Sequence, residues 1–138
     1  MPKSFQQSSK GFNPFGDLVG LRFSRCDKGY SECTLMVKEE LLNPHRVVHG
    51  GVMYTMADTG MGAALYPYLD EDELCATIEI EIVYFTPVVS GSLVCEAQLI
   101  HYSGRIAAME SEISCDGRRV ARAMGAYSIF NVKRNSGT

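Results

Sequence analysis

Between Gly50 and Leu65 the chain carries a single charged side chain, Asp58, among apolar and small residues. A segment that is apolar on nearly every side is typical of a helix surrounded by the rest of its protein. A lone carboxylate is costly to bury there unless it is paired, hydrogen-bonded or protonated. Burial also favours the general-base chemistry of carboxylates. We therefore expect Asp58 to be functional, the alternative being an Asp that points from the helix into solvent.

The segments around this helix predict strands. Residues 18–26 and 30–37 are strand candidates before it, and residues 38–48, which contain Asn43-Pro44, predict a loop. After the helix come four segments with strand patterning or composition, starting with the alternating isoleucines of residues 78–82 and ending with residues 120–130. The pattern predicts an α+β fold in which one antiparallel sheet wraps around one long central helix. Residues 1–16 are expected to be a flexible leader and residues 17–138 a single domain.

Composition excludes several classes of protein. A net charge of −3 argues against general nucleic-acid binding, and no apolar run has membrane-spanning character. The five cysteines form no C-x-x-C pair, as expected of reduced core residues. The first residues lack the apolar core of a signal peptide, so we expect a cytoplasmic protein that does not associate with membranes.

The residues around the helix carry a family resemblance. The pattern is Asn43, five residues, His49-Gly50-Gly51, six residues, then Asp58. It resembles the signature of hotdog-fold acyl-CoA thioesterases of the phenylacetic-acid-pathway (PaaI-like) type. Tyr84-Phe85-Thr86-Pro87 with Gly91, and the Asp116-Gly117 hairpin, resemble the later strands of that family. The likeness covers about residues 17–131 and implies hydrolysis of acyl-CoA, with no metal and no cofactor beyond the coenzyme A of the substrate.

The chemistry of such a reaction suits the glycines and the carboxylate. Gly50 and Gly51 open the helix, where backbone N–H groups are unpaired and the helix dipole is positive. Glycine also lets a substrate carbonyl approach the backbone closely. We expect the Gly50 N–H to be the oxyanion donor, Gly51 to contact substrate, and Asp58 to act as general base or as nucleophile.

The resemblance implies roles for three further residues. Asn43 would contact the thioester carbonyl or place water, His49 would shape the loop before the helix, and Thr77 would hydrogen-bond to the water. Three arginines at predicted hairpin ends are candidates for contacts to the phosphates of coenzyme A, although exposed strand ends look the same: Arg105, Arg118 and Arg119.

Spacing predicts a shared site. Gly50 and Asp58 are eight residues apart, which separates them by about 12 Å along one helix. Both an oxyanion donor and a base must lie about 3 Å from the reacting groups. Two antiparallel copies of the helix can meet that demand, so we expect a homodimer, which pairs further into a homotetramer.

Two other functions remain open at this level. A hotdog acyl-carrier-protein dehydratase would pair a loop histidine such as His45 with Asp58, and a non-catalytic acyl-CoA sensor would keep only the pocket. His45 and His49 lack the H-E-x-x-H pattern of a zinc site, so no metal is expected. The acyl group, aromatic or medium-chain, is not determined by the sequence.

Overall fold

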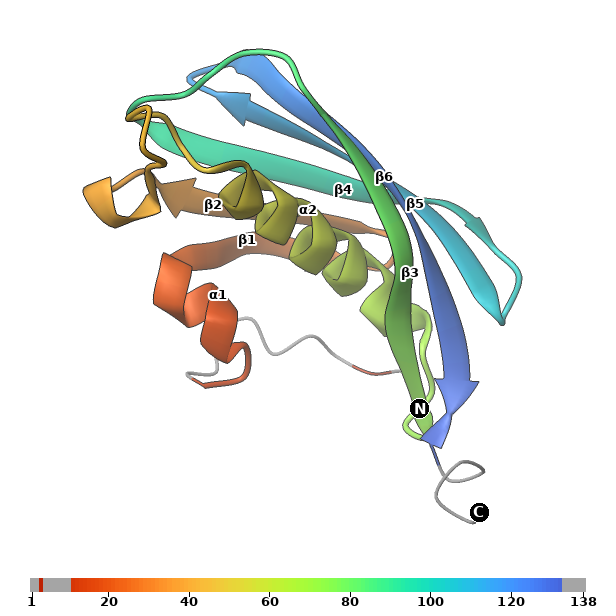
Figure 1. Cartoon of the computed structure of the whole chain (residues 1–138). Helices are drawn as coiled ribbons and strands as arrows, with labels where there is room; N and C mark the ends of the chain where they lie inside the picture. The colour runs from red at the N-terminus through yellow and green to blue at the C-terminus, as the bar shows by residue number, and fades with distance from the viewer. Residues whose placement is uncertain (1–2, 4–10, 133–138) are drawn as a thin grey trace.

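Six antiparallel strands form one curved sheet that wraps around helix α2 (Figure 1). The computed structural model describes residue 3 and residues 11–132. In chain order the elements are α1 (Pro14–Val19), β1 (Leu21–Asp27), β2 (Tyr30–Met36), the 3₁₀ turn η1 (Glu39–Leu41), α2 (Gly50–Leu65), the 3₁₀ turn η2 (Tyr66–Tyr68), β3 (Glu73–Tyr84), β4 (Ser92–Tyr102), β5 (Ile106–Cys115) and β6 (Arg118–Asn131). The sheet order is β1-β2-β4-β5-β6-β3. This confirms the α+β prediction of one sheet around one long helix.

The N-terminal segment differs in part from the prediction. Residues 18–20 do not begin a strand, because α1 runs to Val19 and Gly20 then adopts the left-handed conformation, with φ 86°, that ends a helix. The expected boundary at residue 17 therefore falls inside α1. Residues 1–2 and 4–10 of the predicted leader lie outside the described residues.

Helix α2 lies close to the sheet because small side chains meet where it crosses. A Cβ added at Gly60 would lie 3.5 Å from the Cys95 sulfur and 3.6 Å from the Ala97 Cβ. The Ser31 hydroxyl donates a 2.6 Å hydrogen bond to the Gly60 carbonyl, which links β2 to the helix. These contacts hold α2 against the inner face of the sheet. The buried core consists of the side chains at this helix–sheet interface.

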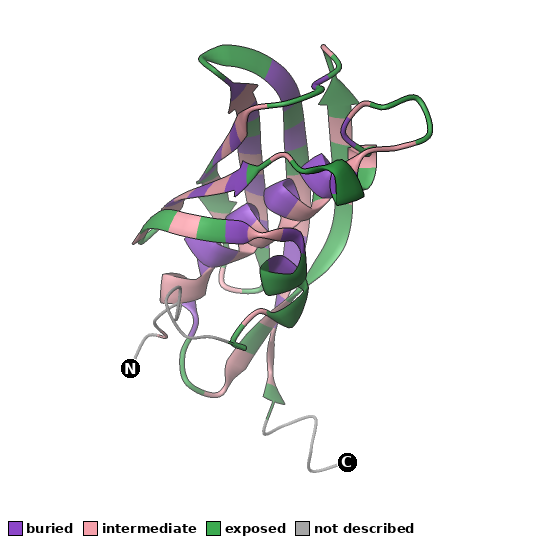
Figure 2. Cartoon of the chain, turned by 90° about the vertical axis from the view of Figure 1, so that its left-hand side faces the viewer, coloured by how far each residue is buried: buried purple, intermediate pink, exposed green. Residues whose placement is uncertain are grey.

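One stripe of α2 remains uncovered, contrary to the expectation of a helix surrounded on all sides. Figure 2 shows buried residues on the helix and on the strand faces that meet it. After Gly50, which is itself half-buried, the positions that are not buried follow helical spacing along the other side: Gly51, Tyr54, Thr55, Asp58, Thr59 and Gly62. We call these six residues the open stripe. Asp58 thus lies half-buried at the border of the core.

Strand β3 forms one edge of the sheet. It pairs only with β6 among the strands that the structure describes, and none of its residues is fully buried. An unpaired strand edge of this length offers a row of backbone donors and acceptors to another chain. The open stripe and this edge of β3 are therefore two uncovered surfaces of the described residues.

Candidate active site

Asp58 is held by two hydroxyl groups from the sheet. The Thr77 hydroxyl donates a 2.7 Å hydrogen bond to Asp58 Oδ1, and the Tyr127 hydroxyl lies 2.9 Å from the same oxygen. Thr77 is on β3 and Tyr127 on β6, and the two are direct partners in the strand pairing. The resemblance placed Thr77 against a water molecule, whereas here its hydroxyl orients the carboxylate itself.

A β-bulge brings Thr77 to that position. The pairing of β3 with β6 shifts between Thr77 and Glu79, which leaves Ile78 as an extra residue, 55% exposed. Strict alternation would place Thr77 on the face opposite Ile80, but one inserted residue reverses the phase of the strand. The predicted alternation of inward isoleucines is therefore wrong at Ile78, and this irregularity is what directs Thr77 toward the helix.

Tyr127 is the residue that sequence reasoning did not identify. Its side chain is 2% exposed, and its hydroxyl also lies 3.0 Å from the Asp58 backbone carbonyl. Burial, followed by the neighbouring Asp58 charge, raises the pKa of Tyr127 well above its usual range. The hydroxyl therefore stays protonated and donates to Asp58. No local sequence signal separates Tyr127 from the other tyrosines of the chain.

The other half of the candidate site is the start of α2. His49 caps the helix, since its Nδ1 accepts a 2.8 Å hydrogen bond from the Gly51 N–H. Among the described residues no acceptor is found for the Gly50 N–H. The Tyr84 hydroxyl donates to the Gly50 carbonyl at 2.7 Å, and a Cβ on Gly50 would lie 3.0 Å from that hydroxyl. Gly50 thus presents a free N–H in a place where a larger residue would be crowded.

Asn43 lies in the tight turn that leads to this helix. Its side-chain oxygen accepts hydrogen bonds from the backbone N–H groups of His45, at 2.9 Å, and Val47, at 3.4 Å. The turn is closed by a backbone bond from Asn43 N–H to the Val47 carbonyl, and Arg46 takes a positive φ of 65°. With the oxygen engaged in the turn, the amide NH₂ is the part of Asn43 that can donate to a ligand.

An apolar groove of about 340 Å³ borders Gly50. It is lined by Val47, Val48, Gly50, Met53 and residues 84–88. Such a lining suits an apolar ligand that must bring one polar group to a backbone donor. Gly50 therefore sits at the wall of a ligand-sized groove, while Asp58 lies further along the helix.

The three candidate arginines are not in one place. Arg118 lines a pocket that shares Pro87 and Val88 with the groove beside Gly50. Arg119 makes a 3.1 Å ion pair with Glu112. Arg105 lies in the β4–β5 turn, where its carbonyl accepts from Ile129 N–H at the other end of the sheet. Only Arg118 is therefore joined by shared lining residues to the groove beside Gly50.

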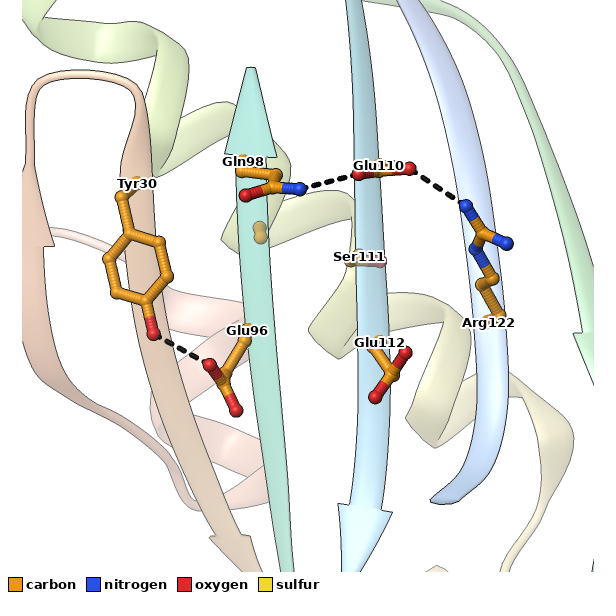
Figure 3. A pocket seen from close by; sticks show the side chains of 8 residues that line it. Tyr30, Glu96, Gln98, Glu110, Ser111, Glu112 and Arg122 are labelled. Atoms are coloured by element: carbon orange, nitrogen blue, oxygen red, sulfur yellow. Dashed lines mark hydrogen bonds and ion pairs between the residues drawn. The ribbon is translucent and has the colours of Figure 1, made fainter. Parts of the chain in front are cut away.

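A further hollow lies on the outer face of the sheet and carries paired polar groups (Figure 3). Tyr30 donates to Glu96, while Gln98 and Arg122 both donate to Glu110. The hydrogen bonds from Gln98 and then Arg122 hold the pKa of Glu110 below its usual range. This face has the character of a solvated surface whose charges bind one another, and it lies on the side of the sheet away from α2.

Comparison with known proteins identifies the family of this chain. Residues 45–122, more than half of the chain, match the family model described as "Thioesterase superfamily". The chain belongs to the thioesterase superfamily. The matched region contains the start of α2, Asp58 and Thr77.

Individual relatives of this thioesterase superfamily member are distant but similar in length. A protein of Archaeoglobus fulgidus named "Putative esterase" is 28% identical over 86% of this chain and 75% of its own. A conserved protein of Pseudomonas aeruginosa is 27% identical, with a TM-score of 0.80 over 86% of this chain and 94% of its own. A variant of the phenylacetic acid degradation protein PaaI from Thermus thermophilus is 24% identical, with a TM-score of 0.79 over 84% and 98%. The fold is therefore the hotdog fold of PaaI-like thioesterases.

The described residues contain neither a candidate membrane span nor a candidate metal cluster. None of the helices described is long and apolar enough to cross a membrane. Within the same residues, no three His, Cys, Asp or Glu side chains form a group that could hold a metal ion. The groups that the structure places at the candidate site are the Asp58 carboxylate, the hydroxyls of Thr77 and Tyr127, and the backbone N–H of Gly50.

Proposed function

We propose that this protein hydrolyses acyl-CoA thioesters to a free acid and coenzyme A. The observation that carries the proposal is the pair of groups on α2: a carboxylate oriented by Thr77 and Tyr127, and an unpaired N–H on Gly50 at the positive end of the helix. A superfamily of thioesterases supplies the general chemistry. Acyl-CoA is the substrate class that the PaaI-like resemblance implies.

The proposed reaction uses these two groups in turn. Asp58 takes a proton from water as the water oxygen bonds to the thioester carbon, and the carbonyl oxygen becomes an oxyanion that accepts from the Gly50 N–H. The intermediate then collapses and the C–S bond breaks. The leaving thiolate of coenzyme A takes up the proton that Asp58 removed from water, which returns Asp58 to its ionised form. Direct attack by Asp58, through an anhydride that water then hydrolyses, uses the same groups. Asn43 is placed to donate from its amide to the carbonyl or to water.

We propose that each site is shared by two subunits. In one chain Asp58 and Gly50 are eight positions apart on a continuous helix, about 12 Å along its axis, which is too far for one thioester. The open stripe and the free edge of β3 are the surfaces through which a second copy would bring its Gly50 to this Asp58. Hotdog thioesterase homologues are typically oligomeric, which supports this arrangement.

Release of free thiol from a panel of aromatic and medium-chain acyl-CoAs tests the proposal. We expect turnover with at least one class, and we expect Asp58→Asn to lower its rate constant by about 10²–10⁴-fold, the range for a lost general base. Asparagine retains an acceptor oxygen for Thr77 and Tyr127, so the variant should fold normally.

The alternatives give different products. A dehydratase would release an alkene thioester without free thiol, and a sensor would bind acyl-CoA without turnover. Near wild-type turnover by Asp58→Asn would show that Asp58 is structural and that the mechanism is wrong.

A further inference from the structure

The Asp58 carboxylate is held by one of its two oxygens. Oδ1 accepts from Thr77 at 2.7 Å and lies 2.9 Å from the Tyr127 hydroxyl. No donor among the described residues is found for Oδ2. An ionised carboxylate has acceptor sites on both oxygens, so this arrangement leaves Oδ2 free to act on another group.

Tyr127 fixes the direction in which Oδ2 points. Its hydroxyl lies 2.9 Å from Oδ1 and 3.0 Å from the backbone carbonyl of the same Asp58. One hydroxyl close to both acceptors ties the side chain to its own helical turn. The Tyr127 ring is buried between the sheet and α2, whereas Thr77 is exposed. Close packing therefore restricts the movement of Tyr127 more than that of Thr77.

We propose that Tyr127 is a positioning residue that, together with Thr77, holds Asp58 by Oδ1 so that Oδ2 is the reacting oxygen. The inference rests on the proposed function, because the reaction gives Oδ2 its role. Tyr127 does not touch the substrate in this proposal. It acts through Asp58 by limiting the carboxylate to one orientation, which contributes to catalysis because reacting groups must be aligned.

Three uncharged side chains from the sheet lie near Asp58. Tyr127 approaches from β6, while Thr77 and Cys75 approach from β3. Burial, and then the charge of Asp58, raises the pKa of Cys75, so its thiol stays neutral. Asp58 is the only charged residue of α2. The two hydroxyl groups of Thr77 and Tyr127 stabilise this negative charge, so the loss of one donor should be measurable.

Tyr127→Phe removes the hydroxyl and keeps the ring. We expect kcat for acyl-CoA to fall about 10–100-fold with KM within twofold, because the lost interaction supports the reaction and not substrate binding. The control is Tyr102→Phe, whose hydroxyl bonds to the Tyr68 carbonyl away from the site. Tyr102→Phe should change neither kcat nor KM.

Thr77→Val and the double variant test whether the two hydroxyls act as a unit. If both hold the same oxygen, the double variant should lose less than the product of the two single losses. Full multiplicativity would overturn a shared role on Oδ1. Thermal unfolding of each variant shows whether lost activity reflects lost folding.

A measurement without substrate separates this proposal from the proposed function. The carboxyl carbon of Asp58 can be followed by ¹³C NMR at one fixed pH and assigned with Asp58→Asn. We expect its chemical shift to change in Tyr127→Phe, which loses the hydrogen bond to Oδ1, and not in Tyr102→Phe. A changed chemical shift in a protein that hydrolyses no thioester would refute the enzyme but keep the Tyr127–Asp58 link. An unchanged chemical shift and an unchanged kcat would refute the positioning role while leaving the thioesterase assignment in place.

Discussion

At the scale of single residues, position distinguishes arginines that look alike in the sequence. Arg118 lines the pocket next to the groove at Gly50 and makes none of the ion pairs found among the described residues. Arg105 lies in the turn at the far end of the sheet, and Arg119 is paired with Glu112. If coenzyme A extends outward from the Gly50 end of the groove, Arg118 is the cation that its phosphates would meet.

Arg118→Ala should therefore weaken binding and leave chemistry intact. We expect KM for acyl-CoA to rise about tenfold with kcat within twofold, the pattern of a lost contact that substrate and transition state share. Steady-state kinetics with acyl-CoA and with a short thioester lacking the nucleotide measure this. Arg105→Ala is the matched control and should behave as wild type. Equal losses on both substrates would point instead to a folding defect at the β5–β6 hairpin.

At the scale of elements, the start of α2 depends on an unusual cap. His49 takes the position that Ser, Thr, Asp or Asn usually occupies, and its Nδ1 accepts from the Gly51 N–H. His49→Ala should lower the free energy of unfolding by about 1 kcal/mol, the typical cost of a lost N-cap. The midpoint of urea denaturation measures this. His49→Asn should recover much of the loss, because asparagine is a favoured N-cap. Equal stability of all three proteins would mean that the cap contributes nothing.

At the scale of the whole molecule, the proposed shared site predicts that two inactive variants restore each other. In that arrangement, Asn43→Ala and Asp58→Asn damage opposite ends of the site. In a mixed dimer one site then collects both lesions and the other none. After equal mixing and random pairing, about half of the dimers are mixed, and activity should recover to about a quarter of wild type.

Thiol release after the two variants have been unfolded and refolded together measures that recovery. Mass spectrometry of the intact assembly confirms that mixed dimers have formed, and each variant refolded alone is the control. If the site lay within one chain, every site in the mixture would carry a lesion. Mixed dimers without activity would thus refute the shared geometry and leave the thioesterase assignment untouched.

The sequence by itself predicted helix α2, most of the strands and the carboxylate at the centre of the candidate site. Periodicity and the placement of glycine and proline predicted α2 from Gly50, as well as the four strands that follow it, because these signals act over a few residues. The same locality made Asp58 visible, since a single charge in an apolar run needs no tertiary information to be noticed. The sequence pattern from Asn43 to Asp58 indicated the resemblance to hotdog-fold thioesterases.

Only the tertiary structure decided what surrounds Asp58. Tyr127 lies 69 positions away in the chain, and no local pattern could join its hydroxyl to that carboxylate. The bulge at Ile78 is equally invisible, because Ile78, Ile80 and Ile82 keep a perfect alternation in sequence while strand pairing breaks it. Register is a property of two strands together, and a shift of one residue reverses every side chain beyond it. The sequence alone therefore identifies Asp58, whereas the folded sheet determines that Thr77 and Tyr127 hold its carboxylate.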